Sequence, residues 1–387
     1  MKRVYLDHSA TTPLAPEVFE AMRLFLTEAF GNASSIHGFG REAKRALEES
    51  RERIARHIGA SFDEVYFNSG GTESDNHALT GVFLAARESG KNHVVISAIE
   101  HHAVLETAEH LKSLGARLTV LPVDRLGRVA LAAAGKALDA DTCLISVMHA
   151  NNEVGTIQAI EEIGALARAK GILVHSDAVQ SLGKLPIDVR SLPVDVLSFS
   201  AHKIYGPKGI GATYIRKGTK IESLLRGGAQ ESKRRAGTEN VAGAVGFARA
   251  VELCYTILET ESPRLGNLRQ ELLARIQKQF PDLVVNGDFT HSLPNILSVS
   301  FDSSLRKLDG DALIMGMDLR GVAVTSGSAC TSGSLQASHV LLAMGRDMQT
   351  ARATVRFSLG RSTTREEIAY AAEAFCDVVK SVEAAQR

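Results

Sequence analysis

The stretch Ser198-Phe-Ser-Ala-His-Lys-Ile-Tyr-Gly-Pro-Lys-Gly-Ile-Gly211 places one lysine, Lys203, between an apolar segment and a glycine-rich turn. Residues 196–199 are predicted to form a buried strand, and the glycines let the backbone turn tightly and approach a ligand. A lysine that loses water at a strand end has a lowered pKa, and its free amine can form an imine. Taken alone, such a stretch more often belongs to a surface lysine beside a turn.

Outward from this stretch, apolar segments alternate with segments of helical periodicity. The expected strands are residues 64–68, 93–97, 118–122, 144–149, 172–177 and 194–199. Because these strands are almost continuously apolar and are separated by helices, we expect an α/β fold with a mainly parallel sheet covered by helices. In such sheets, ligands bind at the carboxyl ends of the strands.

The pattern changes toward the C-terminal third of the chain. We expect two helices there, over residues 241–260 and 265–280, and then a smaller α+β domain that the N-terminal strand joins. The predicted domains are residues 15–259 for the large domain, and residues 1–14 together with 260–387 for the small domain.

The 387-residue chain has 44 basic and 44 acidic residues, so no net charge attracts it to nucleic acid or to an anionic membrane. Its first residues lead into a strand pattern without the apolar run of a signal peptide, and no run of about 18 apolar residues occurs. We therefore expect a cytoplasmic protein. The cysteines, Cys143, Cys254, Cys330 and Cys376, lack paired spacing, which argues against an intrinsic metal site or a disulfide framework.

A second motif, Ser69-Gly-Gly-Thr-Glu-Ser-Asp75, follows the predicted strand 64–68 and leads into a helix. Backbone N–H groups and the positive end of the helix face one point in such a turn, and the Thr72 hydroxyl beside Gly71 adds a donor. The motif is neither a Walker loop nor a Gly-x-Gly-x-x-Gly turn. It predicts a site for one phosphate, although such turns are also common as helix caps.

Two further polar residues are placed near Lys203 by the predicted sheet. Asp177 ends a strand 26 residues before Lys203, and His101 follows the strand 93–97. A phosphate-binding turn, an imine-forming lysine, an acid that keeps a ring nitrogen protonated and a histidine that stacks on the ring together describe a pyridoxal phosphate site. Singly, Asp177 is also explained as a helix cap and His101 as a loop residue.

These and other motifs resemble those of a known family. They are Asp7-His-Ser-Ala-Thr-Thr, Gly71-Thr-Glu-Ser-Asp-Asn, Glu100-His101, Asn151-Asn-Glu-Val-Gly, Asp177-Ala-Val-Gln, Ser200-Ala-His-Lys-Ile-Tyr-Gly-Pro-Lys-Gly, Ala236-Gly-Thr-Glu-Asn, Ser326-Gly-Ser-Ala-Cys and Val355-Arg-Phe-Ser-Leu-Gly-Arg. In this order, from about residue 3 to residue 370, they resemble the cysteine desulfurases of the NifS/IscS type. That family consists of class V, fold-type I pyridoxal phosphate (PLP) transferases, with a large sheet domain and a smaller α+β domain.

The resemblance implies a role for each matching residue. It makes Lys203 the Schiff-base lysine, and His101 the ring-stacking residue and proton shuttle. The residues implied to bind the cofactor are Gly71, Thr72, His101, Asn152, Asp177, Gln180, Ser200, His202, Lys203 and Thr238. Of these, Thr238 is implied to reach the phosphate of the neighbouring subunit in a homodimer. Asn152 and Arg356 match the positions that bind the substrate carboxylate, and a guanidinium suits this task because it binds a carboxylate bidentately.

Cys330 distinguishes among the chemistries of this family. It lies among serines and glycines that cannot bury it, whereas the other three cysteines lie in apolar segments. We expect its thiolate to attack the sulfur of L-cysteine while Lys203 removes the Cα proton, so that alanine leaves and a persulfide remains on Cys330. The expected acceptor is an iron–sulfur scaffold, with which Cys330 would transiently ligate a cluster, or another sulfur carrier such as one for tRNA thiolation.

Two other functions stay open on the sequence alone. A class V aminotransferase shares the cofactor site but needs no nucleophilic thiol. A catalytically inactive adaptor of sulfur assembly retains the fold, but burying Lys203 and Asp177 without using them costs stability. For Cys330, the alternative is an incidental cysteine in a disordered linker.

Overall fold

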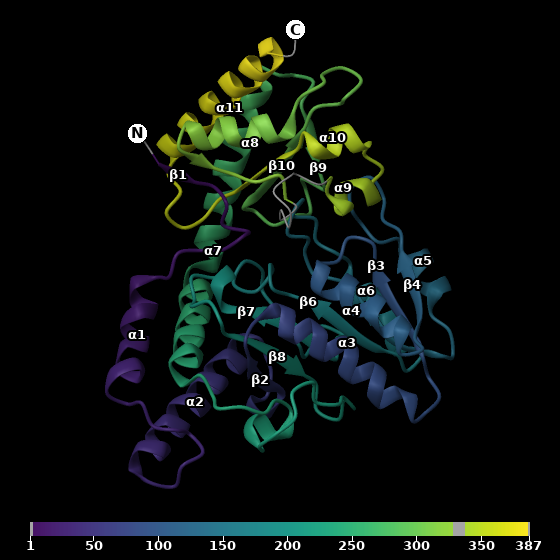
Figure 1. Ribbon diagram of the computed structural model, residues 1–387, viewed down its shortest axis with the longest axis vertical. Coiled ribbons are helices and arrows are strands. Elements are labelled where there is room, and N and C mark those ends of the chain that lie inside the picture. The colour runs from purple at the N-terminus through teal and green to yellow at the C-terminus, as the bar shows by residue number, and fades with distance from the viewer. Residues whose placement is uncertain (1–2, 328–336, 386–387) are drawn as a thin grey trace.

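The computed structural model describes residues 3–327 and 337–385. Its largest sheet has seven strands in the order β2-β8-β7-β6-β5-β3-β4 (Figure 1). The strands are β2 (Val65–Asn68), β3 (His93–Ser97), β4 (Arg117–Leu121), β5 (Thr142–Ser146), β6 (Leu173–Asp177), β7 (Val196–Ser200) and β8 (Gly211–Ile215). Neighbouring strands from β4 to β7 run parallel, whereas β8 runs antiparallel to β7 and β2. The predicted α/β fold with a mainly parallel sheet is confirmed.

Helices cover both faces of this sheet, because alternate residues of a strand point to opposite faces. Val94 and Ile96 of β3 pack in the cluster of α3 (Gly71–Arg87) and α4 (His102–Ser113), whereas Val95 belongs to the cluster of α2 (Gly38–His57) and α6 (Ile160–Arg168). The helices of this part are α1 (Pro16–Thr27), α2 (Gly38–His57), α3 (Gly71–Arg87), α4 (His102–Ser113), α5 (Leu131–Ala137) and α6 (Ile160–Arg168), with the 3-10 helices η1 (Phe62–Glu64), η2 (Ala201–Lys203) and η3 (Gln230–Lys233). Burial on both faces explains why these strands are apolar almost throughout.

A single long helix, α7 (Val241–Gln277), replaces the two helices expected on either side of residue 260. Pro263 lies inside it and removes one N–H from the helical hydrogen bonds, which is why the sequence indicated a break. The helix continues because both of its halves are buried, Phe247 in one core and Leu272 in another. The expectation was wrong because packing outweighed the local preference of proline.

By length and composition, α7 is also the one helix of residues 3–327 and 337–385 that could cross a membrane. In this fold, 56% of its most apolar window is buried inside the protein. Such burial is typical of a core helix.

The second core combines the N-terminal strand with the C-terminal part of the chain. β1 (Val4–Tyr5) pairs in parallel with β11 (Val322–Ala323), and Val4 packs in the same cluster as Leu272. A small antiparallel sheet follows in the order β12-β10-β9. Its elements are β9 (Val284–Asn286), β10 (Ile296–Ser300) and β12 (Val355–Ser358), accompanied by α8 (Gly310–Leu319), α9 (His339–Ala343), α10 (Met348–Arg352) and α11 (Arg365–Ala385).

In Figure 1 these elements lie above the seven-stranded sheet, and α7 extends from one part into the other. The predicted domain boundary at residues 259 and 260 therefore falls inside a helix.

Candidate active site

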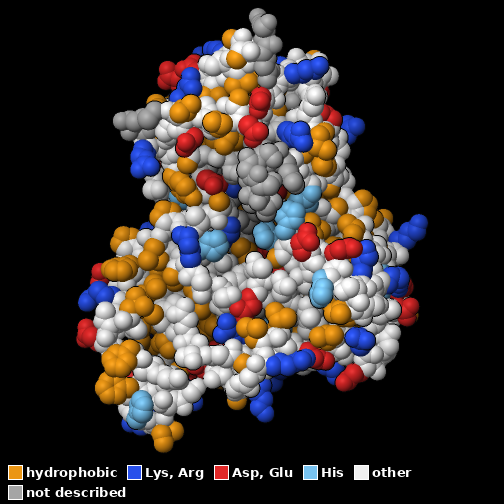
Figure 2. All heavy atoms as spheres, viewed as in Figure 1, with side chains coloured by type: hydrophobic (Ala, Val, Ile, Leu, Met, Phe, Trp, Pro, Cys, Tyr) orange, Lys and Arg blue, Asp and Glu red, His pale blue; other side chains and the backbone are white. Residues whose placement is uncertain are grey.

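A cavity of about 370 Å³ lies between the seven-stranded sheet and the small C-terminal sheet. The carboxyl ends of β6 and β7, the first residues of α3 and α4, and β12 contribute to its lining, and Figure 2 shows histidine side chains around the hollow between the two parts. The predicted site residues that line it are Gly71, Thr72, His101, Asn152, Asp177, Gln180, Ser200, His202, Lys203 and Arg356. Its volume is in the range of small-molecule sites.

Lys203 is the last residue of η2, which directly follows β7. Its Nζ atom donates hydrogen bonds to the carbonyl oxygens of Ser9 (2.6 Å) and Ala10 (2.8 Å). Burial, together with the nearby Arg356 cation, lowers the pKa of Lys203 to about 8, although Asp177 opposes the shift. A useful fraction of the amine is therefore unprotonated near neutral pH, as a nucleophilic lysine requires.

The backbone turn after Lys203 is held in an unusual conformation. Tyr205 has a φ of 67°, in the left-handed region that bulky residues rarely adopt. The Thr12 hydroxyl accepts a hydrogen bond from the Tyr205 N–H at 2.7 Å and donates one to the His202 carbonyl at 2.9 Å. The N-terminal segment thus fixes the turn that carries the lysine.

The turn between β2 and α3 has a shape that favours glycine. Gly70 has a φ of 152°, and Gly71 begins α3. A Cβ atom on Gly71 would lie 2.6 Å from Val179 Cγ2, and one on Gly211 would lie 2.6 Å from Gly70 Cα. The first N–H groups of α3 have no acceptor within the helix, so together with the Thr72 hydroxyl they form a site for an anion.

Ser200 and His202 add polar groups near this turn. Ser200 ends β7 and is buried, and His202 follows in η2. Burial lowers the pKa of His202 to about 4, and its Nδ1 lies 3.1 Å from Thr11 Oγ1. The ring is therefore neutral at physiological pH, and the other ring nitrogen is left for a ligand.

Two buried carboxyl groups, Asp177 and Asp75, line the cavity. Asp177 accepts a hydrogen bond from the Val179 N–H at 2.8 Å, and burial raises its pKa, although His101 opposes the shift. Burial and the Asp177 charge raise the pKa of Asp75 well above its ordinary value. Asp75 Oδ1 accepts no hydrogen bond among the described residues, and His175 Nε2 lies 3.5 Å from it. A cationic ring nitrogen would offset the cost of burying these groups, so the pair fits a pyridinium ring. Asp75 stands in the Gly71-Thr-Glu-Ser-Asp-Asn motif, but the motif by itself predicts no role for it.

His101 caps α4, where its Nδ1 accepts a hydrogen bond from the Ala103 N–H at 3.1 Å. Burial lowers the pKa of His101, so its ring is neutral at physiological pH. Because Nδ1 accepts, the proton of the neutral ring resides on Nε2. Such a ring can stack on a planar ligand and exchange a proton with it.

His339 also lines the cavity, although sequence analysis did not identify it. Its Nε2 lies 2.9 Å from the Glu100 carbonyl oxygen, and its ring centroid lies 4.7 Å from that of His102.

The buried Glu100 carboxyl accepts hydrogen bonds from the Ser97 hydroxyl and from the Met148 N–H at 2.9 Å, and burial raises its pKa to about 8. Glu100 is therefore protonated at neutral pH, and it supports the segment that carries His101.

Arg356 brings a buried guanidinium into the cavity from β12. It donates to the Asn152 carbonyl oxygen at 2.9 Å and to Asp7 Oδ1 at 2.8 Å, and its Nε has no partner in the described part of the chain. Two of its five N–H groups are thus engaged, which leaves donors for a carboxylate. The structure brings Arg356 and Asn152 together through the backbone carbonyl of Asn152.

Two predicted residues are absent from the described lining. Thr238 is exposed and lies in the loop before α7. Cys330 lies outside the described residues, and Gly327, the last described residue before it, lines the cavity. The roles inferred for both stay predictions.

A mainly parallel sheet with a lysine, an anion-binding helix start and buried carboxyl groups at one edge is the arrangement of fold-type I PLP enzymes. Residues 4–370 match the family described as Aminotransferase class-V, and the chain belongs to this family of PLP enzymes.

Within this family, the chain is most informatively compared with individual proteins and solved structures. The chain is 51% identical to "Cysteine desulfurase IscS" of Dictyoglomus turgidum, over 96% of this chain and 93% of that protein. A solved structure described as "NIFS-LIKE PROTEIN" has a TM-score of 0.91 and 40% identity, and the alignment covers 98% of this chain and 100% of the other. A structure described as "SspA in complex with cysteine" has a TM-score of 0.81 and 35% identity, covering 92% and 98% of the two chains. These similarities confirm the predicted fold class and family resemblance.

Proposed function

We propose that this protein is a cysteine desulfurase that uses PLP to convert L-cysteine into L-alanine and transfers the sulfur to Cys330. The observation that carries the proposal is that Lys203, with its lowered pKa, shares one cavity with Asp177, His101 and Arg356. The named relatives align over nearly the whole chain. One similar structure is described as a complex with cysteine, which supports the choice of substrate.

The residues of the cavity fit PLP. The turn at Gly71 and Thr72, with Ser200 and His202, offers donors for the phosphate, and a side chain on Gly71 would fill this turn. Asp177 offers a carboxylate for the ring nitrogen. When bound, PLP supplies an electron-accepting ring that stabilises negative charge at the Cα atom of an amino acid.

The chain's own groups then perform separate tasks. Arg356, with Asn152, binds the substrate carboxylate, so the Cα–H bond is oriented toward Lys203. The Lys203 amine takes the Cα proton, and the His101 Nε2–H provides a second proton donor. Cys330 supplies the thiolate that attacks the cysteine sulfur. In the net reaction the bond between Cβ and sulfur in L-cysteine breaks, and that sulfur forms a bond with the Cys330 sulfur. The Cβ atom gains a proton, so the products are alanine and a Cys330 persulfide, and no external oxidant is needed.

We further propose that the enzyme is a homodimer. Large apolar side chains are exposed on α1, on the loop after it and on α2, and Figure 2 shows them as an orange group at the lower left. They include Phe19 (48% exposed), Leu26 (58%), Phe30 (71%), Ile36 (90%) and Phe39 (56%). A second copy would cover this apolar face, and the exposed Thr238 would then serve the phosphate site of the neighbouring subunit.

The persulfide of a desulfurase must leave the enzyme. We propose a protein acceptor, either an iron–sulfur scaffold with which Cys330 transiently ligates a cluster or a carrier for tRNA thiolation. We place this reaction in the cytoplasm. The balance of 44 basic and 44 acidic residues supports an enzyme that binds neither nucleic acid nor an anionic membrane.

Mass spectrometry after brief exposure of the PLP-loaded protein to L-cysteine tests the proposal. We expect one added sulfur on the peptide that contains Cys330, and formation of alanine. Cys330→Ser should abolish alanine formation while retaining bound PLP. Cys376→Ser, at a buried thiol of the second core, is the control and should stay active. Alanine formation by Cys330→Ser at the normal rate, or a wild-type protein without a visible PLP absorption band, would contradict the proposal.

A further inference from the structure

Lys184 is a cation beside the cavity to which neither the motifs nor the proposed chemistry assigns a role. It lies in the turn segment after β6, where its Nζ donates to the carbonyl oxygen of Gln180 at 3.0 Å and to Gln180 Oε1 at 3.0 Å. It forms no ion pair with a carboxylate within the described chain. Burial and the nearby Lys203 cation lower the pKa of Lys184 to about 7. Because the folded protein disfavours this charge, stability alone does not explain the presence of a lysine.

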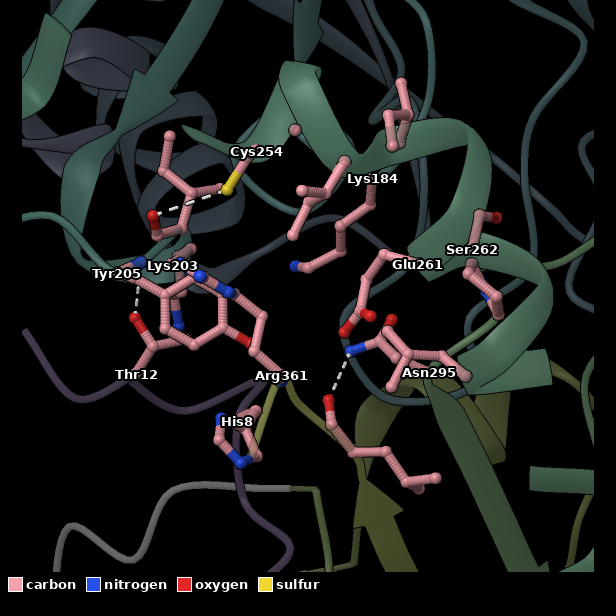
Figure 3. Close-up of a pocket in the computed structure, with 17 residues that line it drawn as sticks. His8, Thr12, Lys184, Lys203, Tyr205, Cys254, Glu261, Ser262, Asn295 and Arg361 are labelled. Atoms are coloured by element: carbon pink, nitrogen blue, oxygen red, sulfur yellow. Dashed lines mark hydrogen bonds between the residues drawn. The ribbon is translucent and has the colours of Figure 1, made fainter. Parts of the chain in front are cut away.

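The Lys184 side chain extends into a second, smaller pocket of about 40 Å³, shown in Figure 3. Lys203 lines both this pocket and the larger cavity. The charges that shift the pKa of Lys184 belong to Lys203, Arg356 and the Cys254 thiol, and Lys184 in turn lowers the pKa of His8 and His202. Glu261 and Arg361 line the same pocket. Glu261 is paired with Arg264 at 2.7 Å, and no ion pair joins it to Lys184 within the described chain.

Gln180 connects Lys184 to the cofactor cavity. It is buried and lines the cavity, and its Nε2 donates to the Ser9 carbonyl oxygen at 2.9 Å. The same Ser9 oxygen accepts the 2.6 Å hydrogen bond from Lys203. Lys184, Gln180, Ser9 and Lys203 therefore form one continuous hydrogen-bonded chain.

The partners of Gln180 determine which way its amide points. A carbonyl oxygen only accepts, so Nε2 must face Ser9, and Oε1 then accepts from Lys184 Nζ, which carries N–H groups whether or not it is protonated. In the flipped amide, Oε1 would face the Ser9 carbonyl oxygen, and two acceptors would lie against each other. In this orientation the second N–H of Gln180 has no acceptor among the described residues, and Gln180 lines the cavity.

We propose that Lys184 is a positioning residue of the cofactor site: by donating to Gln180 Oε1, it fixes the Gln180 amide as a hydrogen-bond donor and thereby selects a ligand with an acceptor oxygen at that point. The ring oxygen of PLP has this chemistry. The inference rests on the proposed function, because it takes PLP as the ligand.

PLP affinity of the full-length apo-protein tests this role without measuring turnover. Lys184→Met keeps the length of the side chain but removes the donor, and we expect PLP to bind about fivefold to tenfold more weakly, the equivalent of one hydrogen bond. The visible absorption band of the bound PLP should shift in Lys184→Met as it does in Gln180→Met. Lys184→Arg, which still donates, should restore both the affinity and the band.

The double variant Lys184→Met/Gln180→Met separates positioning from other effects. If Lys184 acts through Gln180, the double variant binds PLP no more weakly than Gln180→Met alone. The inference would be overturned if the double variant bound PLP more weakly than Gln180→Met by the full factor seen for Lys184→Met alone. Wild-type PLP affinity and spectrum in Lys184→Met would overturn it as well.

Lys170→Met is the matched control, because Lys170 Nζ also donates to two carbonyl oxygens, those of Gly135 and Leu138, and does not line the cavity. It should leave PLP affinity unchanged, and an equal loss there would show a general effect of destabilisation and refute the inference. A wild-type protein that does not bind PLP would refute the proposed function, whereas wild-type binding with an unaffected Lys184→Met refutes only the role of Lys184.

Discussion

The Arg356 guanidinium donates to the Asp7 carboxylate at 2.8 Å, although the two residues are 349 positions apart in the chain. Two residues after Asp7, the Ser9 carbonyl oxygen accepts the hydrogen bond from Lys203. A short N-terminal segment therefore orients both the proposed substrate-binding cation and the proposed nucleophilic lysine. The relative positions of these two groups depend on contacts between the ends of the chain and its middle.

Arg356→Lys is expected to raise the KM for L-cysteine about tenfold to a hundredfold. A lysine offers a point charge in place of a planar fork, and a hydrogen bond to a charged group contributes about 1.5–3 kcal/mol. Steady-state alanine formation measures the effect. Arg269→Lys is the control, because Arg269 is also buried but binds backbone carbonyls of the second core away from the cavity. An unchanged KM in Arg356→Lys would contradict the assignment.

Lys203→Met should change how the stability of the apo-protein depends on pH. The pKa of Lys203 is about 8 in the folded protein and about 10.5 in an exposed lysine, so the unfolded chain binds more protons between these values. The free energy of unfolding of the wild type therefore rises relative to that of Lys203→Met as pH increases from about 8 to about 10.5. The full shift corresponds to about 3 kcal/mol, and we expect less because the side chain is partly accessible.

Urea unfolding of both apo-proteins at several pH values across this window provides the measurement. Stability curves that stay parallel from pH 8 to pH 10.5 would show that Lys203 is not a lysine of lowered pKa.

Glu100→Gln should stabilise the protein at pH 8 but not at pH 4. Burial raises the pKa of Glu100 to about 8 from an ordinary 4.5, so the folded protein binds more protons between these values and the wild type loses stability as pH rises through them. Glutamine retains the acceptor for Met148 and does not titrate. We expect a relative gain of no more than about 5 kcal/mol at pH 8, measured by chemical unfolding.

Glu109→Gln is the matched control for that experiment, because Glu109 is an exposed residue of the adjoining helix α4. It should change stability little at either pH. A Glu100→Gln protein whose stability differs from that of the wild type by the same amount at pH 4 and pH 8 would contradict a raised pKa.

Gly71→Ala should weaken PLP binding and destabilise the protein by about 1–3 kcal/mol, because the new methyl group would lie 2.6 Å from Val179 Cγ2. Val179→Ala removes that obstacle, so the double variant should recover much of the stability. Chemical unfolding and PLP titration report the two effects separately. If Gly71→Ala lowers stability equally in the wild type and in the Val179→Ala protein, the close approach of the new methyl group to Val179 is not the cause.

The sequence allowed the sheet and half of the cavity-lining residues to be predicted, because the chemistry of these residue types is specific. Apolar strands identified the parallel sheet, and Lys203, Asp177 and Thr72 are side chains whose chemistry is specific. Since parallel strands align their carboxyl ends at one edge of a sheet, residues that directly follow these strands were expected to lie close together.

Other features depend on backbone contacts, which cannot be predicted from residue type. The acceptors for Lys203 are the carbonyl oxygens of Ser9 and Ala10, and every residue has such an oxygen. The cavity position of His339 depends on how the C-terminal part packs against the turn at Glu100. The continuity of α7 through Pro263 depended on the two cores that bury its halves.

That shared helix has a mechanical consequence. If one core rotates relative to the other, α7 must bend, and the easiest place is the turn at Pro263, where the carbonyl of Glu259 lacks its helical N–H partner. Such bending would shift Arg356 relative to Lys203 while both cores stay packed. The distance between Arg356 and Lys203 would then depend on the curvature of α7 as well as on the contacts of the N-terminal segment.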